Sequence, residues 1–320
     1  MKGLRVQYHV YEGMLKVLNG VNITLEKGEK VGIIGESACG KTTTVKAVMR
    51  LLATNSKITD GEVRYAGEDV LKLPKRKLSD LRRKKMSMVF QDPSAALNPV
   101  FTIKQQIYDV IKFSTDDHLS KQETHERAVM YLKQAALPEP DRILDSYPFQ
   151  LSGGMKQRVN IAMALVSANE LLIADEPGTS LDVTIEDQIM RLLKKIVEEK
   201  GLSVILITHA LGTVKNFVDR IYVMYAGTIV EEGPTKEVFN NPQHPYTQML
   251  IKSVPKLTGG GVPEGIIGQV PSYLTPPSGC RFITRCPYKM DVCGTVPAMY
   301  QAGTDQRAAC FLFDEGHRAR

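Results

Sequence analysis

A short glycine-rich loop followed by lysine and threonine is the clearest group of residues in the sequence that could do chemistry. It consists of Gly35, Glu36, Ser37, Ala38, Cys39, Gly40, Lys41 and Thr42, with Thr43 directly after it. The spacing is GxxxxGK(S/T), and the loop follows a strand-like run, 31–34, and opens a predicted helix over 43–52. Backbone N–H groups of such a loop turn inward as an anion nest, the lysine reaches the outer phosphates of a nucleotide, and the threonine hydroxyl binds Mg²⁺. We therefore predict a nucleotide site here and interpret the cysteine within the loop as a small filler.

Two adjacent acids end an apolar run much farther along the chain. The run 171–174 is followed by Asp175 and Glu176. A carboxylate at the carboxyl end of a buried strand, beside a phosphate loop, can hold Mg²⁺ through water, and the next one can polarise the attacking water. Paired acids at a strand end are usually only solvated, but the phosphate loop in the same chain favours a catalytic interpretation. We predict Asp175 as a metal residue and Glu176 as the catalytic base.

A second candidate anion site lies at Ser152, Gly153 and Gly154. These residues precede a predicted helix over 159–166, so that N–H groups and the helix dipole point toward a phosphate. The stretch 151–158, Leu-Ser-Gly-Gly-Met-Lys-Gln-Arg, resembles the signature of ATP-binding cassette proteins. The resemblance implies that this site closes over ATP held by another cassette, so that two cassettes enclose two nucleotides.

Further landmarks of that family follow in order. Gln91 resembles the loop glutamine that senses Mg²⁺ and the transmembrane partner. Ser180, Leu181 and Asp182 resemble the loop exchanged across the cassette dimer, and His209 resembles the switch histidine that contacts the γ-phosphate. The resemblance therefore adds Gln91 to the Mg²⁺ ligands Thr42 and Asp175, and implies a full ATPase site.

One landmark has two candidates, and two positions depart from the family pattern. We predict that Tyr11 stacks on adenine, with Tyr8 as its competitor. Ala210 stands where this subfamily usually has Asp after the switch histidine, and Gly178 stands where it usually has Thr. Neither departure removes a catalytic group.

A narrower resemblance covers nearly the whole chain. The segments 90–93 with 97–99, 147–148 and 181–184, and above all His244-Pro245-Tyr246-Thr247, are similar to the ATPase subunits of oligopeptide and dipeptide importers. That subfamily carries a C-terminal extension and works with two transmembrane permease subunits, commonly a second and different ATPase, and an external binding protein. Peptide, oligosaccharide and metal-chelate cargo all stay open, and so does the choice between a homodimer and a heterodimer.

Strand-forming and helical segments alternate over most of the chain, and they must position these residues. Runs rich in β-branched residues predict strands at 30–34, 86–90, 171–175, 204–208 and 221–225. Several are apolar on both faces, which indicates a largely parallel sheet flanked by helices. Between 101 and 147 the strand signal disappears, and a capping-box pattern at Ser120 and Glu123 opens a predicted helix over 119–137. We therefore predict an α/β fold with a helical insertion.

Composition sets the expected domain organisation. The chain has 320 residues, of which 43% are hydrophobic and 24% charged, and this excludes global disorder and predicts one sizeable core plus an appendage. A stretch rich in Pro and Gly marks a boundary near residue 255. We predict a nucleotide-binding domain over 1–255, with a helical subdomain at about 101–165, and an extension over 256–320 that packs separately from the phosphate loop.

Location follows from hydropathy, and a rival function follows from charge. No apolar run approaches the ~18–20 residues of a spanning helix, and the start of the chain lacks the pattern of a secretory signal. We expect a cytosolic chain, attached peripherally to the cytoplasmic face of the membrane.

The formal net charge of +6 is compatible with a rival function, that of a soluble cassette ATPase that acts on nucleic acid. Such proteins usually carry two cassettes in one chain or a long coiled coil, so we expect no nucleic acid here.

Four of the five cysteines lie in the predicted extension. They are Cys280, Cys286, Cys293 and Cys310, with the spacing C-x5-C-x6-C-x16-C. Four thiols in a short cytosolic segment indicate a metal, because disulfides are disfavoured there. Zinc commonly takes more closely spaced pairs, whereas iron–sulfur clusters accept varied spacing. Some members of the similar subfamily carry a [4Fe–4S] cluster here, so we expect one, with zinc and metal-free cysteines as alternatives.

Overall fold

The computed structural model describes residues 1–179, 181–253 and 265–316. Their contacts form two compact units. Unit 1 comprises Met1–Thr24, Val31–Lys72 and Thr208–Arg320, and unit 2 comprises Leu25–Lys30 and Leu73–Ile207. The predicted boundary near residue 255 falls on residues 254–264, which lie outside the described part of the chain, and it stays a prediction.

The described strands of unit 1 belong to two larger sheets and a short hairpin. In one sheet they follow the order β12-β13-β11-β10-β3, and in the other the order β2-β1-β4. Strand β10 is parallel to β3 and antiparallel to β11, whereas β1 pairs antiparallel with both of its neighbours. The bounds are β1 (Lys2–Val10), β2 (Gly13–Val21), β3 (Lys30–Ile34), β4 (Ser56–Glu62), β5 (Arg64–Tyr65), β6 (Glu68–Asp69), β10 (Arg220–Tyr225), β11 (Thr228–Pro234), β12 (Tyr300–Gln301) and β13 (Arg307–Ala308).

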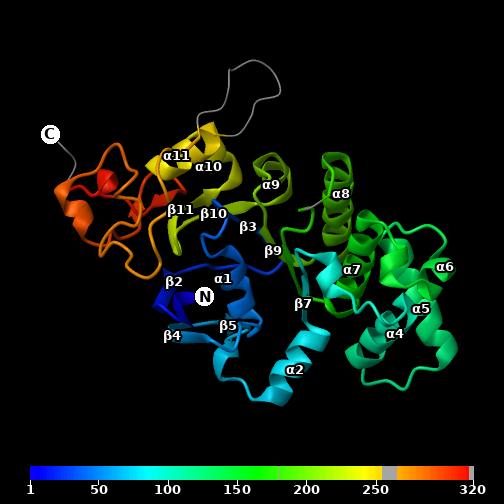
Figure 1. The fold of residues 1–320 in the computed structure, drawn as a ribbon. Coiled ribbons are helices and arrows are strands. Elements are labelled where there is room, and N and C mark those ends of the chain that lie inside the picture. The colour runs from blue at the N-terminus through cyan, green and yellow to red at the C-terminus, as the bar shows by residue number, and fades with distance from the viewer. Residues whose placement is uncertain (180, 254–264, 317–320) are drawn as a thin grey trace. The chain divides into compact units, whose positions relative to one another are not determined.

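The helices of unit 1 are short. Their bounds are α1 (Lys41–Val48), α9 (Leu211–Phe217), α10 (Thr235–Asn240) and α11 (Pro245–Lys252), with 3₁₀ turns η1 (Val70–Lys72), η3 (Asp291–Gly294) and η4 (Phe311–Phe313). After α11, the described residues 265–316 form mainly turns and loops around β12 and β13 (Figure 1).

Strand β11 was not predicted from the sequence, because two acids and a glycine interrupt its apolar pattern. Glu231 and Glu232 are both buried in it. The Glu231 carboxylate accepts hydrogen bonds from the backbone N–H groups of Gln243 and His244, and Glu232 pairs with Arg307. Polar partners elsewhere in unit 1 thus compensate the buried charges.

Unit 2 contains the parallel strands β9, β8 and β7, in this order, and most of the long helices. The strands span β7 (Met86–Val89), β8 (Leu171–Asp175) and β9 (Ser203–Ile207). The helices span α2 (Lys75–Lys84), α3 (Pro93–Ala96), α4 (Ile103–Ser114), α5 (Lys121–Gln134), α6 (Pro140–Asp145), η2 (Pro148–Gln150), α7 (Gly153–Ser167) and α8 (Val183–Lys200). All residues of β8 and β9 are buried, as the apolar run in each predicts, including Asp175 at the end of β8 and Ser203 at the start of β9.

The described elements between β7 and β8 are all helices or 3₁₀ turns, in the part of the chain where we predict a helical insertion. Figure 1 shows α4, α5 and α6 beside one another, and α4 and α5 both pack against α7. A cluster of buried side chains that includes Ile103, Ile107, Leu132 and Val159 forms their common core. No helix in the described ranges is long and apolar enough to cross a membrane.

The predicted element bounds hold where the pattern is strongest. Strands β3 and β8 begin and end where the sequence predicts, and the capping box of Ser120 and Glu123 opens α5. Helix α7 differs, because it begins at Gly153 instead of residue 159. The Ser152 side chain caps it, so the two glycines after Ser152 form its first turn rather than a preceding loop.

Candidate nucleotide-binding site

The phosphate loop connects β3 to α1 within unit 1. Gly35 and Gly40 have φ angles of 152° and 109°, and Ala38 has 60°. A Cβ atom at Gly35 would collide with the carbonyl oxygen of Met224, so that position requires glycine. The predicted strand–loop–helix arrangement is therefore present.

The ammonium group of Lys41 lies within this loop. Its Nζ donates hydrogen bonds to the carbonyl oxygens of Gly35 and Glu36, each at 3.0 Å. The hydroxyl of Thr44 donates to the carbonyl oxygen of Gly40 at 2.9 Å, in the first turn of α1. The loop and the start of the helix thus fix the charge that is predicted to neutralise the outer phosphates.

Cys39 has the properties expected of a filler. Its side chain is buried, and burial raises the pKa of the thiol to about 11, although the nearby Lys41 opposes this shift. A thiol with this pKa is protonated at neutral pH and therefore a poor nucleophile.

Tyr11 and His209, two further predicted nucleotide residues of unit 1, are exposed. Tyr11 stands at the turn between β1 and β2 with its ring fully accessible, whereas its competitor Tyr8 is half-buried in β1. His209 is exposed just before α9, and Ala210 occupies the N-cap position of that helix without a side-chain cap. The N–H of Ala210 instead donates to the hydroxyl of Thr208 at 2.9 Å.

The two acids lie at the end of β8 in unit 2. Asp175 is buried, and Glu176 has a left-handed backbone with φ of 47°. The N–H of Glu176 donates to the carbonyl oxygen of Ile207 at 2.8 Å, which holds this strained residue in place. Its Oε2 accepts hydrogen bonds from Gln91 Nε2 at 2.7 Å and from Thr179 Oγ1 at 3.2 Å. The structure therefore brings the predicted base and the predicted loop glutamine into direct contact.

The predicted signature residues begin α7 and pack tightly. A Cβ atom at Gly153 would lie 3.3 Å from Leu181, and one at Gly154 would lie 3.0 Å from Ile185. Asp182 caps the neighbouring helix α8 by accepting a hydrogen bond from the N–H of Ile185 at 2.9 Å. Ser180, which was predicted with Asp182, lies outside the described residues.

Two polar residues of α7 were not singled out by the sequence reasoning. Gln157 Nε2 donates to the carbonyl oxygen of Pro177 at 2.6 Å, and Asn160 Nδ2 donates to the carbonyl oxygen of Phe90 at 3.3 Å. Both side chains are buried. They connect α7 to the segments that carry Glu176 and Gln91. Two amide side chains three positions apart, and so on the same side of a helix, were the signal that could have revealed them.

The departure at Gly178 has a structural counterpart. A Cβ atom there would collide with Cγ of Glu186, a half-buried side chain in the first turn of α8. The space that threonine would need is therefore occupied by Glu186.

Cys280, Cys286, Cys293 and Cys310, in the C-terminal segment of unit 1, lie close enough to influence one another electrostatically. None of them forms a disulfide, and the N–H of Cys280 donates to the carbonyl oxygen of Cys293 at 3.0 Å. Burial, together with the neighbouring cysteines, raises the pKa of Cys280 and of Cys310 to about 11. Within the described ranges, however, no three His, Cys, Asp or Glu side chains are grouped so that they could hold a metal ion. The thiols suit iron or zinc chemically, and the cluster stays a prediction, because the described residues show no preformed group of ligands.

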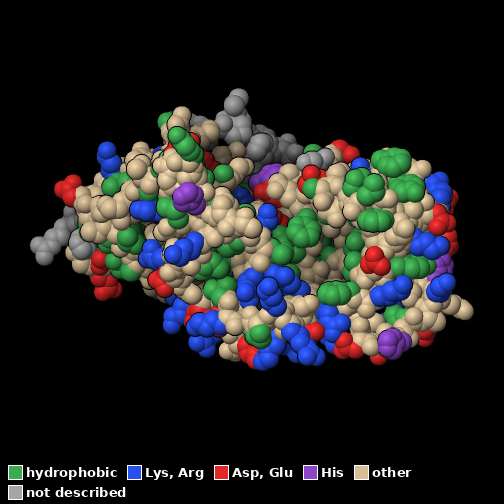
Figure 2. Space-filling model, turned by 60° about the horizontal axis from the view of Figure 1, so that its bottom comes forward, with side chains coloured by type: hydrophobic (Ala, Val, Ile, Leu, Met, Phe, Trp, Pro, Cys, Tyr) green, Lys and Arg blue, Asp and Glu red, His purple; other side chains and the backbone are tan. Residues whose placement is uncertain are grey.

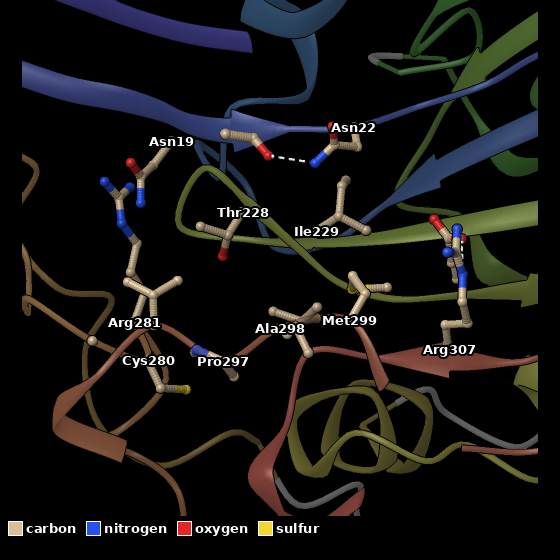
Figure 3. A pocket seen from close by; sticks show the side chains of 16 residues that line it. Asn19, Asn22, Thr228, Ile229, Cys280, Arg281, Pro297, Ala298, Met299 and Arg307 are labelled. Carbon is tan, nitrogen blue, oxygen red and sulfur yellow. Dashed lines mark hydrogen bonds and ion pairs between the residues drawn. The ribbon is translucent and has the colours of Figure 1, made fainter. Parts of the chain in front are cut away.

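A separate cavity of about 430 Å³ also lies in unit 1. Figure 3 shows it between the segment of Asn19 and Asn22, the strand of Thr228 and Ile229, and the chain from Pro297 to Met299. None of its lining residues belongs to the phosphate loop. The cavity is therefore distinct from the nucleotide site.

Comparison with known families agrees with this geometry. A family model described as "ABC transporter" matches residues 18–179, which include the phosphate loop, both acids and the signature. The chain belongs to the ATP-binding cassette family. A second model, described as "Oligopeptide/dipeptide transporter, C-terminal region", matches residues 230–293 of this cassette.

Individual relatives match the cassette over nearly its whole length. The oligopeptide transport ATP-binding protein OppD of Salmonella typhimurium is 42% identical over 309 residues, covering 96% of this chain and 91% of OppD. The dipeptide transport ATP-binding protein DppD of Bacillus subtilis is 41% identical and covers 98% of this chain and 94% of DppD. Among solved structures, the dimeric ATP-binding cassette MJ0796 in a post-hydrolysis state with ADP and Pi has a TM-score of 0.66 and 33% identity. That match covers 73% of this chain and 97% of MJ0796.

Proposed function

We propose that this cassette hydrolyses ATP together with a second cassette and thereby powers the import of oligopeptides or dipeptides through a membrane transporter. The observation that carries the proposal is the near full-length similarity to OppD and DppD, both of which are peptide-transport ATP-binding proteins. The match of residues 230–293 to the peptide-transporter C-terminal region supports the same substrate class.

We propose the residue roles from the family resemblance, supported by local contacts within each unit. In unit 1, Lys41 would hold the outer phosphates and Thr42 would hold Mg²⁺, and the ion would supply positive charge to the phosphate oxygens. In unit 2, Asp175 and Gln91 are the remaining Mg²⁺ residues, and Glu176 takes the proton of the attacking water. The hydrogen bond from Gln91 orients the carboxylate of Glu176 for this transfer. In the partner cassette, Ser152, Gly153 and Gly154 offer the N-terminus of α7 to the phosphates.

We propose further that the cassette binds two permease subunits and a second ATPase at the cytoplasmic face of the membrane, and acts with an external binding protein. Apolar side chains after Gln91 and within the helical insertion support a permease contact. Val100 is 73% exposed and Phe149 is 70% exposed. The ring of Phe149 stacks on that of Tyr147, with 5.5 Å between the two ring centroids. Exposed aromatic pairs of this kind are typical of protein interfaces.

A nucleic-acid function receives less support from the distribution of charge. Lys and Arg side chains gather in places on the face drawn in Figure 2, and α2 is rich in both. Part of this basic charge is neutralised within unit 2. Arg83 and Lys84 both pair with Asp116, and Lys85 pairs with Glu170. Basic residues that already have acidic partners gain less from phosphate contacts.

We also propose that Cys280, Cys286, Cys293 and Cys310 bind a [4Fe–4S] cluster. The thiol donor set and the absence of disulfides among these residues support it. The cluster would fix the fold of the extension, which has little regular secondary structure, and zinc is the alternative metal.

The test is reconstitution with the permease subunits in lipid vesicles. Addition of the binding protein and a peptide should raise ATP hydrolysis, whereas a binding protein without peptide should raise it less. Retardation of DNA or RNA by the chain, without any stimulation by permease and peptide, would instead establish the rival function.

A further inference from the structure

The C-terminal segment of unit 1 holds the phosphate loop directly, contrary to the expectation that the extension packs separately. Arg285 extends its guanidinium group to the carboxylate of Glu36, the second residue of the loop. Nη1 lies 2.8 Å from Oε2, and Nη2 lies 3.1 Å from Oε1, so that the pair is bidentate. The Arg285 side chain is only 2% exposed and that of Glu36 is 28% exposed, so the pair is largely shielded from water.

Every N–H donor of the Arg285 guanidinium group has a hydrogen-bond acceptor. Its Nε donates to the carbonyl oxygen of Ile267 at 3.1 Å, and Nη2 also donates to that of Ile266 at 2.9 Å. Nη1 donates a second hydrogen bond to the hydroxyl of Tyr225 at 3.3 Å. With the two bonds to Glu36, all five N–H donors have acceptors. Lysine cannot reproduce this geometry, because it lacks the planar fork.

Two tyrosines hold the loop backbone on either side of Ser37. The hydroxyl of Tyr246 accepts a hydrogen bond from the N–H of Glu36 at 2.9 Å, and the hydroxyl of Tyr273 donates one to the carbonyl oxygen of Ala38 at 2.8 Å. Burial raises the pKa of both phenols, so both stay neutral hydroxyl groups. Ala38 has a left-handed backbone, a conformation that needs outside support in a residue with a side chain.

A carboxylate within an anion-binding loop disfavours the binding of a negatively charged ligand. Glu36 belongs to the predicted anion-binding loop, and its backbone carbonyl oxygen accepts a hydrogen bond from Lys41, the predicted phosphate-binding lysine. An uncompensated negative charge there would repel a nucleotide, whereas a paired one would not.

We propose that Arg285 neutralises and positions Glu36, and that it acts with Tyr246 and Tyr273 to preset the phosphate loop for nucleotide. Arg285 is a positioning residue, because it acts on the nucleotide site through its contact with Glu36 of the loop. The ATP affinity of this cassette therefore depends on its C-terminal extension. The proposal rests on ATP binding at the phosphate loop.

The experiment measures the ATP dissociation constant of the full chain by calorimetry. Arg285→Gln should weaken binding by about tenfold or more, as expected when one member of a shielded charge pair is removed. Adding Glu36→Gln to that variant should recover most of the loss, because the carboxylate left without a partner is gone. Arg307→Gln is the matched control, since Arg307 also joins the extension to a cassette strand, through Glu232, but does not contact the loop. It should bind ATP as the wild type does.

The outcomes separate charge compensation from general damage. If Arg285→Gln fails to fold, Arg285→Lys keeps the charge without the fork and should bind ATP with intermediate affinity. Tyr273→Phe should weaken binding several-fold, whereas Tyr300→Phe, which loses a hydroxyl bonded to Asp314 in the same extension, should not. Wild-type affinity in Arg285→Gln, or a double variant as weak as the single one, would overturn the proposal. A wild-type chain that does not bind ATP would overturn the proposed function as well.

Discussion

Gln91 and Glu176 are joined by a hydrogen bond of 2.7 Å, although 85 positions separate them in the sequence. The amide donates, so it fixes the orientation of the carboxylate. Gln91 also precedes the segment that we propose as part of the permease contact. A movement of that segment would therefore shift the base directly, which gives the membrane partner a short route to the chemistry.

The first prediction concerns the base. Glu176→Gln should retain ATP binding but lower the rate of hydrolysis by about 10²–10⁴-fold, because the amide cannot accept the proton of water. Steady-state phosphate release and calorimetry measure the two quantities. Glu170→Gln is a suitable control, since this acid pairs with Lys85 at the surface. Hydrolysis by Glu176→Gln at the wild-type rate would disprove the assignment.

The second prediction concerns the buried amide of Gln157. Gln157→Leu should lower the free energy of unfolding by about 1–3 kcal/mol, because the carbonyl group of buried Pro177 loses this donor. Urea denaturation measures the change. Gln188→Leu removes an exposed amide that accepts a hydrogen bond from Arg158, and it should cost well under 1 kcal/mol. Equal losses in the two variants would contradict the structural role of Gln157.

The third prediction tests the contact between Gly178 and Glu186. Gly178→Thr should destabilise unit 2 by about 1 kcal/mol, because the new side chain must displace that of Glu186. Combining it with Glu186→Ala should remove most of this cost, and thermal melting of the single and double variants gives the coupling. Simple additivity would show that the two side chains do not compete for space.

The fourth prediction concerns acid stability. Burial lowers the pKa of His244 to about 3, and its Nδ1 accepts a hydrogen bond from the N–H of Tyr246. The unfolded chain binds this proton near pH 6.5 and the folded chain does not, so stability should fall as the pH drops from about 6.5 toward 3. The slope is about 1.4 kcal/mol per pH unit for this residue.

Urea denaturation at pH 7 and at pH 5 measures this dependence, and His244→Asn isolates the contribution of the histidine. Asparagine can cap α11 without titrating, so the variant should show a flatter pH profile. The comparison is needed because burial raises the pKa of nearby Glu231, which acts with the opposite sign. Identical profiles for the two proteins would refute the prediction.

The fifth prediction concerns the four cysteines of the extension. Protein purified without oxygen should be brown and contain about four iron atoms and matching sulfide per chain, as a [4Fe–4S] cluster requires. Cys286→Ser should lose the metal, whereas Cys39→Ser should keep it, because Cys39 lies in the phosphate loop. One zinc and no iron would replace the cluster with a zinc site, and an anaerobic preparation with neither metal would end the proposal.

The sequence predicts the elements whose signal is local. Strands β3 and β8 and the start of α5 follow from apolar runs and a capping box, and they have the expected bounds. Strands β1 and β2 were not predicted, although Leu4, Val6 and Tyr8 of β1 alternate with polar residues; β2 lacks this regular alternation. The contacts of Gln91 with Glu176 and of Arg285 with Glu36 join segments 85 and 249 positions apart, and no local pattern encodes such pairs.

The short strand β13 has a consequence beyond the nucleotide site. It pairs with β11 through Ala308 and Arg307, so that the last part of the chain covers backbone groups that β11 would otherwise leave open. Uncovered strand borders attract other chains and start aggregation. A cassette truncated before β12 should therefore be prone to self-association even where its ATP site is intact. The C-terminal residues should therefore also keep the cassette soluble, so that their removal would cost solubility as well as the contacts with the phosphate loop.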